Sequence, residues 1–126
     1  MIGQHYVYLL VCKDYEIFKI GETQGIHTRV EELSKHLNYD IKYSFVFTFS
    51  SFDEAIELEK LLHKKFKEFN VPKKNLPKFG GYTEFYYNKI LQDVIIFIIN
   101  SAFTCELEML KDYYKRGRVH WEDVIE

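Results

Sequence analysis

Two short extended segments near the N-terminus constrain the fold most. Residues 5–12 (HYVYLLVC) are rich in β-branched and aromatic side chains, and residues 17–21 (IFKIG) repeat that character. Such segments are typical of half-buried strands. The residues between them, 13–16 (KDYE), supply polar turn chemistry. We therefore expect a β-hairpin at the start of the chain, with the second strand stopping at Gly21.

The rest of the chain alternates between helical and extended patterns. We expect a helix over 26–38, a strand over 41–50, a helix from a capping box at Ser51 and Glu54 to about 69, a loop over 70–81 and a short strand over 82–87. Residues 88–115 are expected to be mostly helical, with a candidate break near Asn100 and Ser101. The order β-β-α-β-α-β-α predicts an α/β (α+β) fold, with a small, mostly antiparallel sheet flanked by helices. We expect a single domain over 1–126, with its core at about 5–87 and a helical extension over 88–126.

Composition excludes several classes of protein. The chain has 126 residues, is 47% hydrophobic and carries a formal net charge of −2, so it is globular but has no overall basic signature for nucleic acid. Its two cysteines, Cys12 and Cys105, lack metal-ligand spacing, and we expect them to be reduced. The longest apolar run, 94–99, is far shorter than the roughly 20 residues that cross a bilayer. We expect no membrane partner and a cytoplasmic protein, or one of the host-cell cytoplasm or nucleus if viral.

The hairpin brings together a tyrosine and a lysine. A turn centred on Asp14 and Tyr15 places Tyr8 opposite Gly21 and diagonal to Lys19, on one face of the sheet. A free phenol has a pKa of about 10, and a nearby cation favours its ionised form. On the hairpin alone, we favour a surface tyrosine beside a surface lysine. We attribute the glycines of the following segment, 21–25, to the turn from strand to helix.

Glu59 is the most informative residue of the second helix. The apolar stripe of that helix comprises Ala55, Leu58, Leu62, Phe66 and Phe69, and Glu59 falls inside its arc. A buried carboxylate without a partner is costly. A divalent cation would compensate it, as would a salt bridge to Arg29 or Lys19, and we favour the cation.

These residues belong to a series of short motifs that follow one another in a fixed order along the chain. The segments are Tyr6-Val7-Tyr8, then Lys19-Ile20-Gly21-Glu22-Thr23, then Arg29, Glu59 within LEKLLH, and a late Gly81-Tyr82-Thr83-Glu84-Phe85. Over about residues 5–87 the set resembles the GIY-YIG nuclease superfamily, in its phage- and virus-associated branch with a Lys-Ile-Gly second motif. Tyr6 stands where that family has its first glycine, and Lys19 where it has its second tyrosine.

The resemblance implies a metal-dependent endonuclease that hydrolyses phosphodiester bonds in DNA. It implies Tyr8 as the base, tuned by Lys19, with Arg29 stabilising charge on the phosphate and Glu59 holding Mg²⁺ or Mn²⁺. Weaker expectations for nucleic-acid contact fall on His63, Lys60, Lys64, Lys67, Tyr82 and Glu84. A half-buried structural histidine is an equal alternative for His63, and a solvated helix face is the usual meaning of a lysine run.

A second class of function stays open. The same scaffold would serve as a nucleic-acid-binding or interaction module with weak or no catalysis. DNA is the expected partner in either case. The apolar helix expected over 88–110 offers a surface for a homo-oligomer. Because we expect no separate DNA-targeting domain in the sequence, we expect specificity to be low or to come from a targeting partner or from oligomerisation.

Overall fold

The N-terminal hairpin forms as expected and organises the sheet. The computed structural model describes residues 4–76 and 84–117. Strand β1 (His5–Val11) pairs antiparallel with β2 (Ile17–Thr23). Their register places Tyr8 opposite Gly21 and Leu10 opposite Lys19, which confirms the predicted pairing. The second strand continues two residues past Gly21 to Thr23, further than the composition indicated.

Three more strands complete an antiparallel sheet in the described residues. Its order is β4-β2-β1-β3-β5, with β1 at the centre. The added strands are β3 (Phe45–Phe49), β4 (Phe85–Tyr87) and β5 (Glu106–Met109). Strand β4 is only three residues long and pairs with Ile17–Lys19, so the rest of β2 does not pair with β4.

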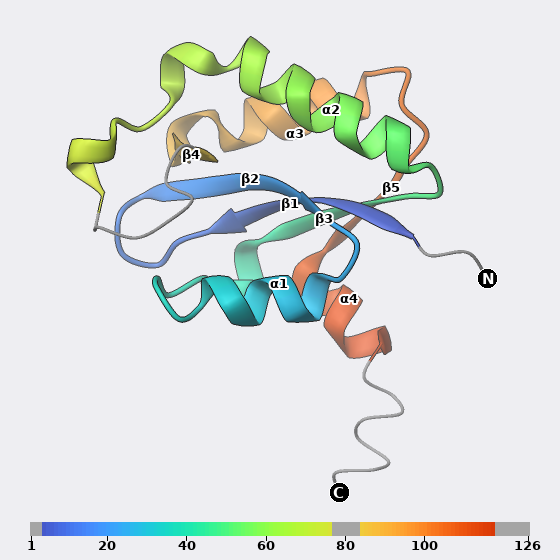
Figure 1. Cartoon of the computed structure of the whole chain (residues 1–126), viewed down its shortest axis with the longest axis horizontal. Helices are drawn as coiled ribbons and strands as arrows, with labels where there is room; N and C mark the ends of the chain where they lie inside the picture. Colours follow the sequence, from blue (N-terminus) through green and yellow to red (C-terminus); the bar gives the residue numbers. More distant parts are fainter. Residues whose placement is uncertain (1–3, 77–83, 118–126) are drawn as a thin grey trace, which may run out of the picture.

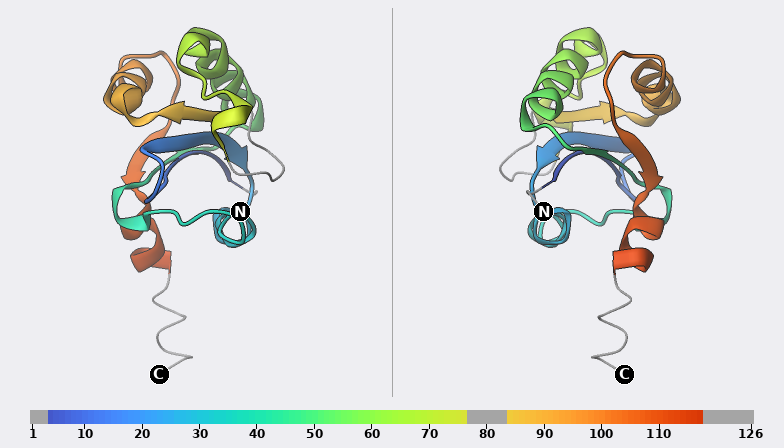
Figure 2. Two further views of the ribbon diagram at one scale, coloured as in Figure 1. Left: turned by 90° about the vertical axis from the view of Figure 1, so that its left-hand side faces the viewer. Right: turned by 90° about the vertical axis from the view of Figure 1, so that its right-hand side faces the viewer.

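Helices cover both faces of this sheet, so that side chains alternating along β1 enter two separate cores. Figures 1 and 2 show α2 (Phe52–Lys65) and α3 (Leu91–Ile99) over one face, and α1 (Ile26–Leu33) and α4 (Leu110–Gly117) over the other. Tyr8 belongs to the core on the α1 side, and Val7 to the core under α2. Short 3-10 helices lie at Ile41–Tyr43, Lys67–Phe69, Lys73–Asn75 and Asn88–Ile90. The predicted fold class, a small mixed α and β domain with an antiparallel sheet, is confirmed.

The mostly helical character expected over 88–115 and its break near Asn100 and Ser101 are confirmed, but the strand β5 within that stretch was missed. The helix α3 ends at Ile99, and the chain then forms β5, which pairs with β3, before α4 begins at Leu110. Strand β5 covers what would otherwise be an open edge of β3, and its ladder of hydrogen bonds outweighs the helical spacing. Two boundaries also differ: α1 ends at Leu33, and residues 41–43 form a 3-10 turn before the strand.

The second helix begins at the predicted cap. The Ser51 side chain accepts a hydrogen bond from the backbone N–H of Glu54 at 3.3 Å. In a full capping box the Glu54 side chain would also accept a hydrogen bond from the backbone N–H of Ser51. Here the Glu54 carboxylate instead accepts a hydrogen bond from the backbone N–H of Thr104 at 3.1 Å. We expect Ser51→Ala to lower the free energy of unfolding by about 1 kcal/mol in urea denaturation. Ser50→Ala, at an exposed neighbouring position, is the control, and an equal effect of both would contradict this role.

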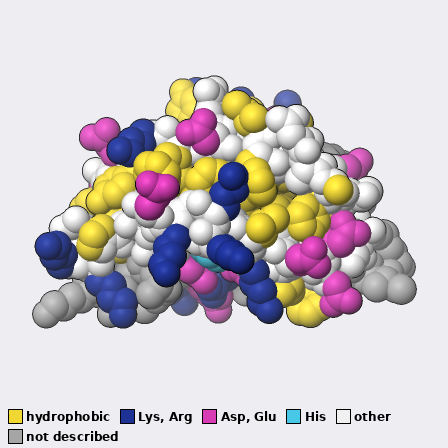
Figure 3. All heavy atoms as spheres, turned by 90° about the horizontal axis from the view of Figure 1, so that it is seen from above, with side chains coloured by type: hydrophobic (Ala, Val, Ile, Leu, Met, Phe, Trp, Pro, Cys, Tyr) yellow, Lys and Arg dark blue, Asp and Glu magenta, His cyan; other side chains and the backbone are white. Residues whose placement is uncertain are grey.

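The apolar run over 94–99 is only partly in the core. In α3, Val94 and Ile98 are buried, whereas Ile96 and Ile99 are 53% and 59% exposed. Figure 3 shows hydrophobic side chains on the face of the molecule that carries α2 and α3. A homo-oligomer through the helix expected over 88–110 stays a prediction. Among the described residues, none of the helices combines the length and apolar character that a membrane span requires. Both cysteines are free.

Candidate active site

The candidate site lies at the edge of the sheet where β4 stops. Strand β4 covers β2 only as far as Lys19, so within the described residues Ile20 to Thr23 form an outer edge. The helices α1 and α2 lie on opposite faces of the sheet at this place (Figure 1). Side chains from β1, β2, α1, α2 and the residue before β4 meet here: Tyr8, Lys19, Arg29, Glu59, His63 and Glu84.

Tyr8 lies flat against its cross-strand partner, Gly21. The Tyr8 side chain is buried, and a Cβ atom at Gly21 would overlap the Tyr8 hydroxyl and ring carbons. Gly21 lies within β2 and pairs opposite Tyr8 there. The attribution of this glycine to a turn is therefore wrong. Its hydrogen side chain is needed because any larger group would expel the tyrosine ring.

Arg29 is the cation at the Tyr8 hydroxyl. Its Nε donates a hydrogen bond to the Tyr8 hydroxyl oxygen at 3.3 Å, and its Nη1 lies 3.6 Å from the carboxylate of Glu32. The sequence-based hypothesis gave this place to Lys19. Burial raises the pKa of Tyr8 to about 12, because it outweighs the hydrogen bond and charge of Arg29, which act downward. The cation does favour the ionised hydroxyl, as expected, but burial opposes it more strongly, so the hydroxyl stays protonated at neutral pH.

Lys19 is a buried lysine that binds a carboxylate. Its side chain is 1% exposed, and its Nζ lies 2.5 Å from Oε1 of Glu84. The ammonium also lies 5.1 Å from the centre of the Phe85 ring. Burial lowers the pKa of Lys19, and the neighbouring Glu84 carboxylate opposes that shift. Glu84, expected only as a weak contact to nucleic acid, is therefore held at the site by an ion pair.

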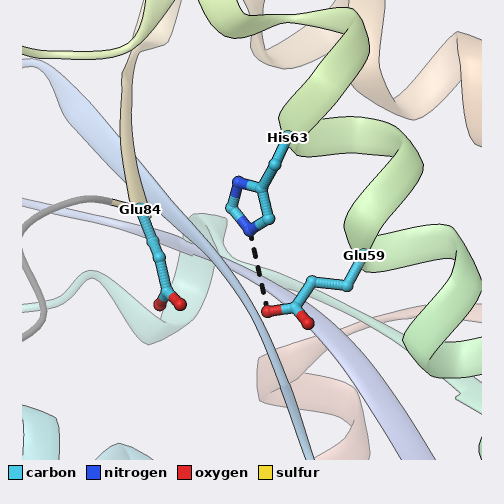
Figure 4. A group of neighbouring side chains, drawn as sticks. All are labelled: Glu59, His63 and Glu84. Atoms are coloured by element: carbon cyan, nitrogen blue, oxygen red, sulfur yellow. Dashed lines mark ion pairs between the residues drawn. The ribbon is translucent and has the colours of Figure 1, made fainter.

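Glu59 reaches the same place from α2. Its side chain is 19% exposed, so it is half-buried but not sealed in the core. Its Oε2 lies 3.6 Å from Nε2 of His63, which is the observed ion-pair partner in place of Arg29 or Lys19. Figure 4 shows both side chains on α2 extending toward Glu84, and the ligand atoms of all three residues lie within 4.8 Å of one another.

Tyr86 is a residue that sequence reasoning missed. Its hydroxyl lies 2.6 Å from Nδ1 of His63, and burial raises its pKa to about 12. The other ring nitrogen of His63, Nε2, is buried and has no hydrogen-bond partner among the described residues. The only sequence signal was its position two residues after Glu84 on a short strand. The histidine is thus anchored at one nitrogen and aimed at Glu59 with the other.

The surroundings of the site include a pocket and a row of lysines. A surface pocket of about 520 Å³ adjoins Arg29 and is also lined by Glu22. The exposed lysines Lys60, Lys64 and Lys67 follow the helical spacing along α2 and the turn after it, beside Glu59 and His63. Figure 3 shows Lys and Arg side chains gathered near acidic side chains and a histidine on this face. Tyr82 lies outside the described residues.

A protein-family model described as the T5orf172 domain matches residues 5–116 of the chain. The matched segment includes every described residue of the site. No curated protein matches, and no solved structure does.

Proposed function

The chain belongs to the T5orf172 domain family, and from that premise we propose that it is a metal-dependent endonuclease of the GIY-YIG type, which hydrolyses phosphodiester bonds in DNA. The T5orf172 domain is a phage-associated domain that some classifications relate to GIY-YIG-like nucleases. The observation that carries the proposal is that Tyr8, Arg29 and Glu59 come from three separate elements and lie at one edge of the sheet. Lys19 joins them from a fourth.

The residues at this edge suit attack of water on a phosphodiester. The reaction needs a base for the water and cations for the charge that develops on the phosphate. Tyr8 would take the proton of the attacking water on its phenolate oxygen. Arg29 is 39% exposed, so its guanidinium is free to donate to phosphate oxygens while remaining near Tyr8. Lys19 positions Glu84 and adds positive charge.

The donor atoms at this edge fit a divalent cation. Glu59 and Glu84 offer carboxylate oxygens, and the buried Nε2 of His63 faces Glu59 without a hydrogen-bond partner. Mg²⁺ or Mn²⁺ held by Glu59 would act as a Lewis acid toward the phosphate and the leaving oxygen. The lysines Lys60, Lys64 and Lys67 would bind the DNA backbone, with an affinity that falls as salt rises.

One observation favours a second candidate function, a nucleic-acid-binding module with little or no hydrolysis. The pKa of Tyr8 is raised to about 12, so at neutral pH very little of this residue is in the form that accepts a proton. In that case Lys60, Lys64 and Lys67 would still bind DNA. Binding without cleavage, in the presence of Mn²⁺ or Mg²⁺, would distinguish this module from a nuclease.

Plasmid cleavage over a range of pH tests the proposal. We expect the parent protein to cut supercoiled plasmid with Mn²⁺ or Mg²⁺ and not with EDTA. Because the pKa of Tyr8 lies near 12, its ionised fraction grows about tenfold per pH unit throughout pH 7–9. The cleavage rate should therefore rise with a similar slope and without a plateau in that range.

The control is a pair of tyrosine variants. Tyr8→Phe removes the hydroxyl and should lose the pH slope, whereas Tyr15→Phe, at a position 45% exposed, should keep it. A slope that survives in Tyr8→Phe would show that another group provides the base. Absence of metal-dependent cleavage at every pH would overturn the proposed function.

A further inference from the structure

We propose that Glu59, His63 and Glu84 form one metal site with three protein ligands, which binds first-row transition-metal dications such as Mn²⁺ more tightly than Mg²⁺. The proposal rests on the proposed function for the role of Glu59 as a metal ligand. It goes further in adding an imidazole and a second carboxylate. These two residues change which metal the site prefers.

The distances suit a single ion. The three ligand atoms lie within 4.8 Å of one another, and the Nε2 of His63 and Oε2 of Glu59 are 3.6 Å apart. An ion that holds its ligands at about 2.0–2.2 Å keeps them at most roughly 4.4 Å apart. Small changes in side-chain torsion angles would bring all three atoms to one ion. Figure 4 shows the side chains reaching toward one another from α2 and from the residue before β4.

His63 is held as a metal-binding histidine is held. Such a residue usually donates a hydrogen bond from its second ring nitrogen to a neighbour, which fixes the ring and its tautomer. Here the Tyr86 hydroxyl lies 2.6 Å from Nδ1, and the two rings are stacked with centroids 5.6 Å apart. If Nδ1 donates to that hydroxyl, the lone pair of Nε2 faces the Glu59 carboxylate. In that tautomer two electron-rich groups face each other, and a metal cation between them would stabilise the arrangement.

Glu84 is fixed by Lys19 and still has a ligand to offer. Its Oε1 is occupied by the Lys19 ammonium, and a carboxylate has a second oxygen with its own lone pairs. The buried lysine thus orients Glu84 without consuming its capacity to bind metal. Two carboxylates and one imidazole leave positions open for water and phosphate on a six-coordinate ion.

The imidazole sets the preference among metals. Mg²⁺ favours oxygen ligands and keeps much of its water, whereas first-row dications also accept imidazole nitrogen; Mn²⁺ is the first and weakest member of that series and is equally suited by carboxylate and water. A site with only Glu59 would bind Mg²⁺ and Mn²⁺ with similar affinity. A site that includes His63 binds Mn²⁺ better, and loses that advantage when the imidazole is removed.

Calorimetric titration of the untagged protein without DNA tests the site. We expect one Mn²⁺ per chain, bound at least about tenfold more tightly than Mg²⁺. His63→Gln should lower the Mn²⁺ affinity at least tenfold and change the Mg²⁺ affinity little, and Tyr86→Phe should lower the Mn²⁺ affinity about tenfold. His36→Gln, at an exposed position, is the matched control. Pulsed electron paramagnetic resonance of bound Mn²⁺ should show ¹⁴N coupling that His63→Gln abolishes.

Circular dichroism shows whether each variant folds. If His63→Gln does not fold, Glu84→Gln is titrated with Mn²⁺ in its place, and a lower affinity than that of the parent is expected. An ion pair between protonated His63 and Glu59 is the competing arrangement. It predicts no ¹⁴N coupling and equal Mn²⁺ affinity in the parent and His63→Gln, and that result would overturn the three-ligand site. Cleavage with Glu59 as the sole protein ligand would survive it. Tight, nitrogen-coupled Mn²⁺ binding without any DNA cleavage would instead overturn the proposed function alone.

Discussion

With Mn²⁺ at a concentration that saturates the parent protein, Glu59→Gln should cleave plasmid DNA at least about a thousandfold more slowly. A Lewis-acid cation contributes several kcal/mol to stabilising charge on a phosphate, and about 4 kcal/mol corresponds to a factor of a thousand. Glutamine keeps the size of the side chain but removes its negative charge. Glu59 also lies next to the Nε2 of His63, so the substitution removes the negative charge that faces this nitrogen.

Stability and a neighbouring glutamate provide the controls for this variant. Glu59 is half-buried and its contact with His63 is 3.6 Å long, so Glu59→Gln should change the melting temperature little. Glu57→Gln alters an exposed carboxylate on the same helix and should leave cleavage unchanged. A folded Glu59→Gln protein that cuts as fast as the parent would remove the metal from the proposed mechanism.

The local parts of the fold were predictable from the sequence because local rules determine them. Turn geometry sets the register of a hairpin, so the pairing of Tyr8 with Gly21 followed from a turn centred on Asp14 and Tyr15. The strand β5 was missed because its alternating Glu106-Leu107-Glu108-Met109 is short and only half-buried. Its partner, β3, lies about 60 residues earlier, and no local pattern reveals such a pairing.

In the candidate site, too, only the features set by local spacing were predictable from the sequence. Glu59 could be found because a carboxylate inside an apolar stripe is visible in helical spacing alone. The ion pair of Lys19 with Glu84 joins residues 65 positions apart, and the contact of His63 with Tyr86 joins residues 23 apart. Which of two cations meets Tyr8 depends on how α1 packs under the sheet, so Arg29 could not be distinguished from Lys19 without the fold.

Gly21→Ala should both destabilise the protein and disable the candidate site. The added methyl would occupy space taken by the Tyr8 hydroxyl and ring, and that ring is 1% exposed and cannot move outward freely. Overpacking of this kind costs about 3 kcal/mol, or roughly 10 °C in melting temperature for a domain of this size. A displaced Tyr8 also loses its hydrogen bond from Arg29, so cleavage should fall by at least tenfold in the fraction that remains folded.

Two further variants separate crowding from a general effect of replacing glycine. Gly25 lies four residues later with extended backbone, and a Cβ there would meet Thr28 only at 4.0 Å, so Gly25→Ala should be tolerated. In a Tyr8→Val background the ring is gone, and Gly21→Ala should then cost little. A double-mutant cycle in urea measures this coupling, which we expect to be at least about 2 kcal/mol. Equal costs of Gly21→Ala in both backgrounds would mean that the ring of Tyr8 does not explain why residue 21 is glycine.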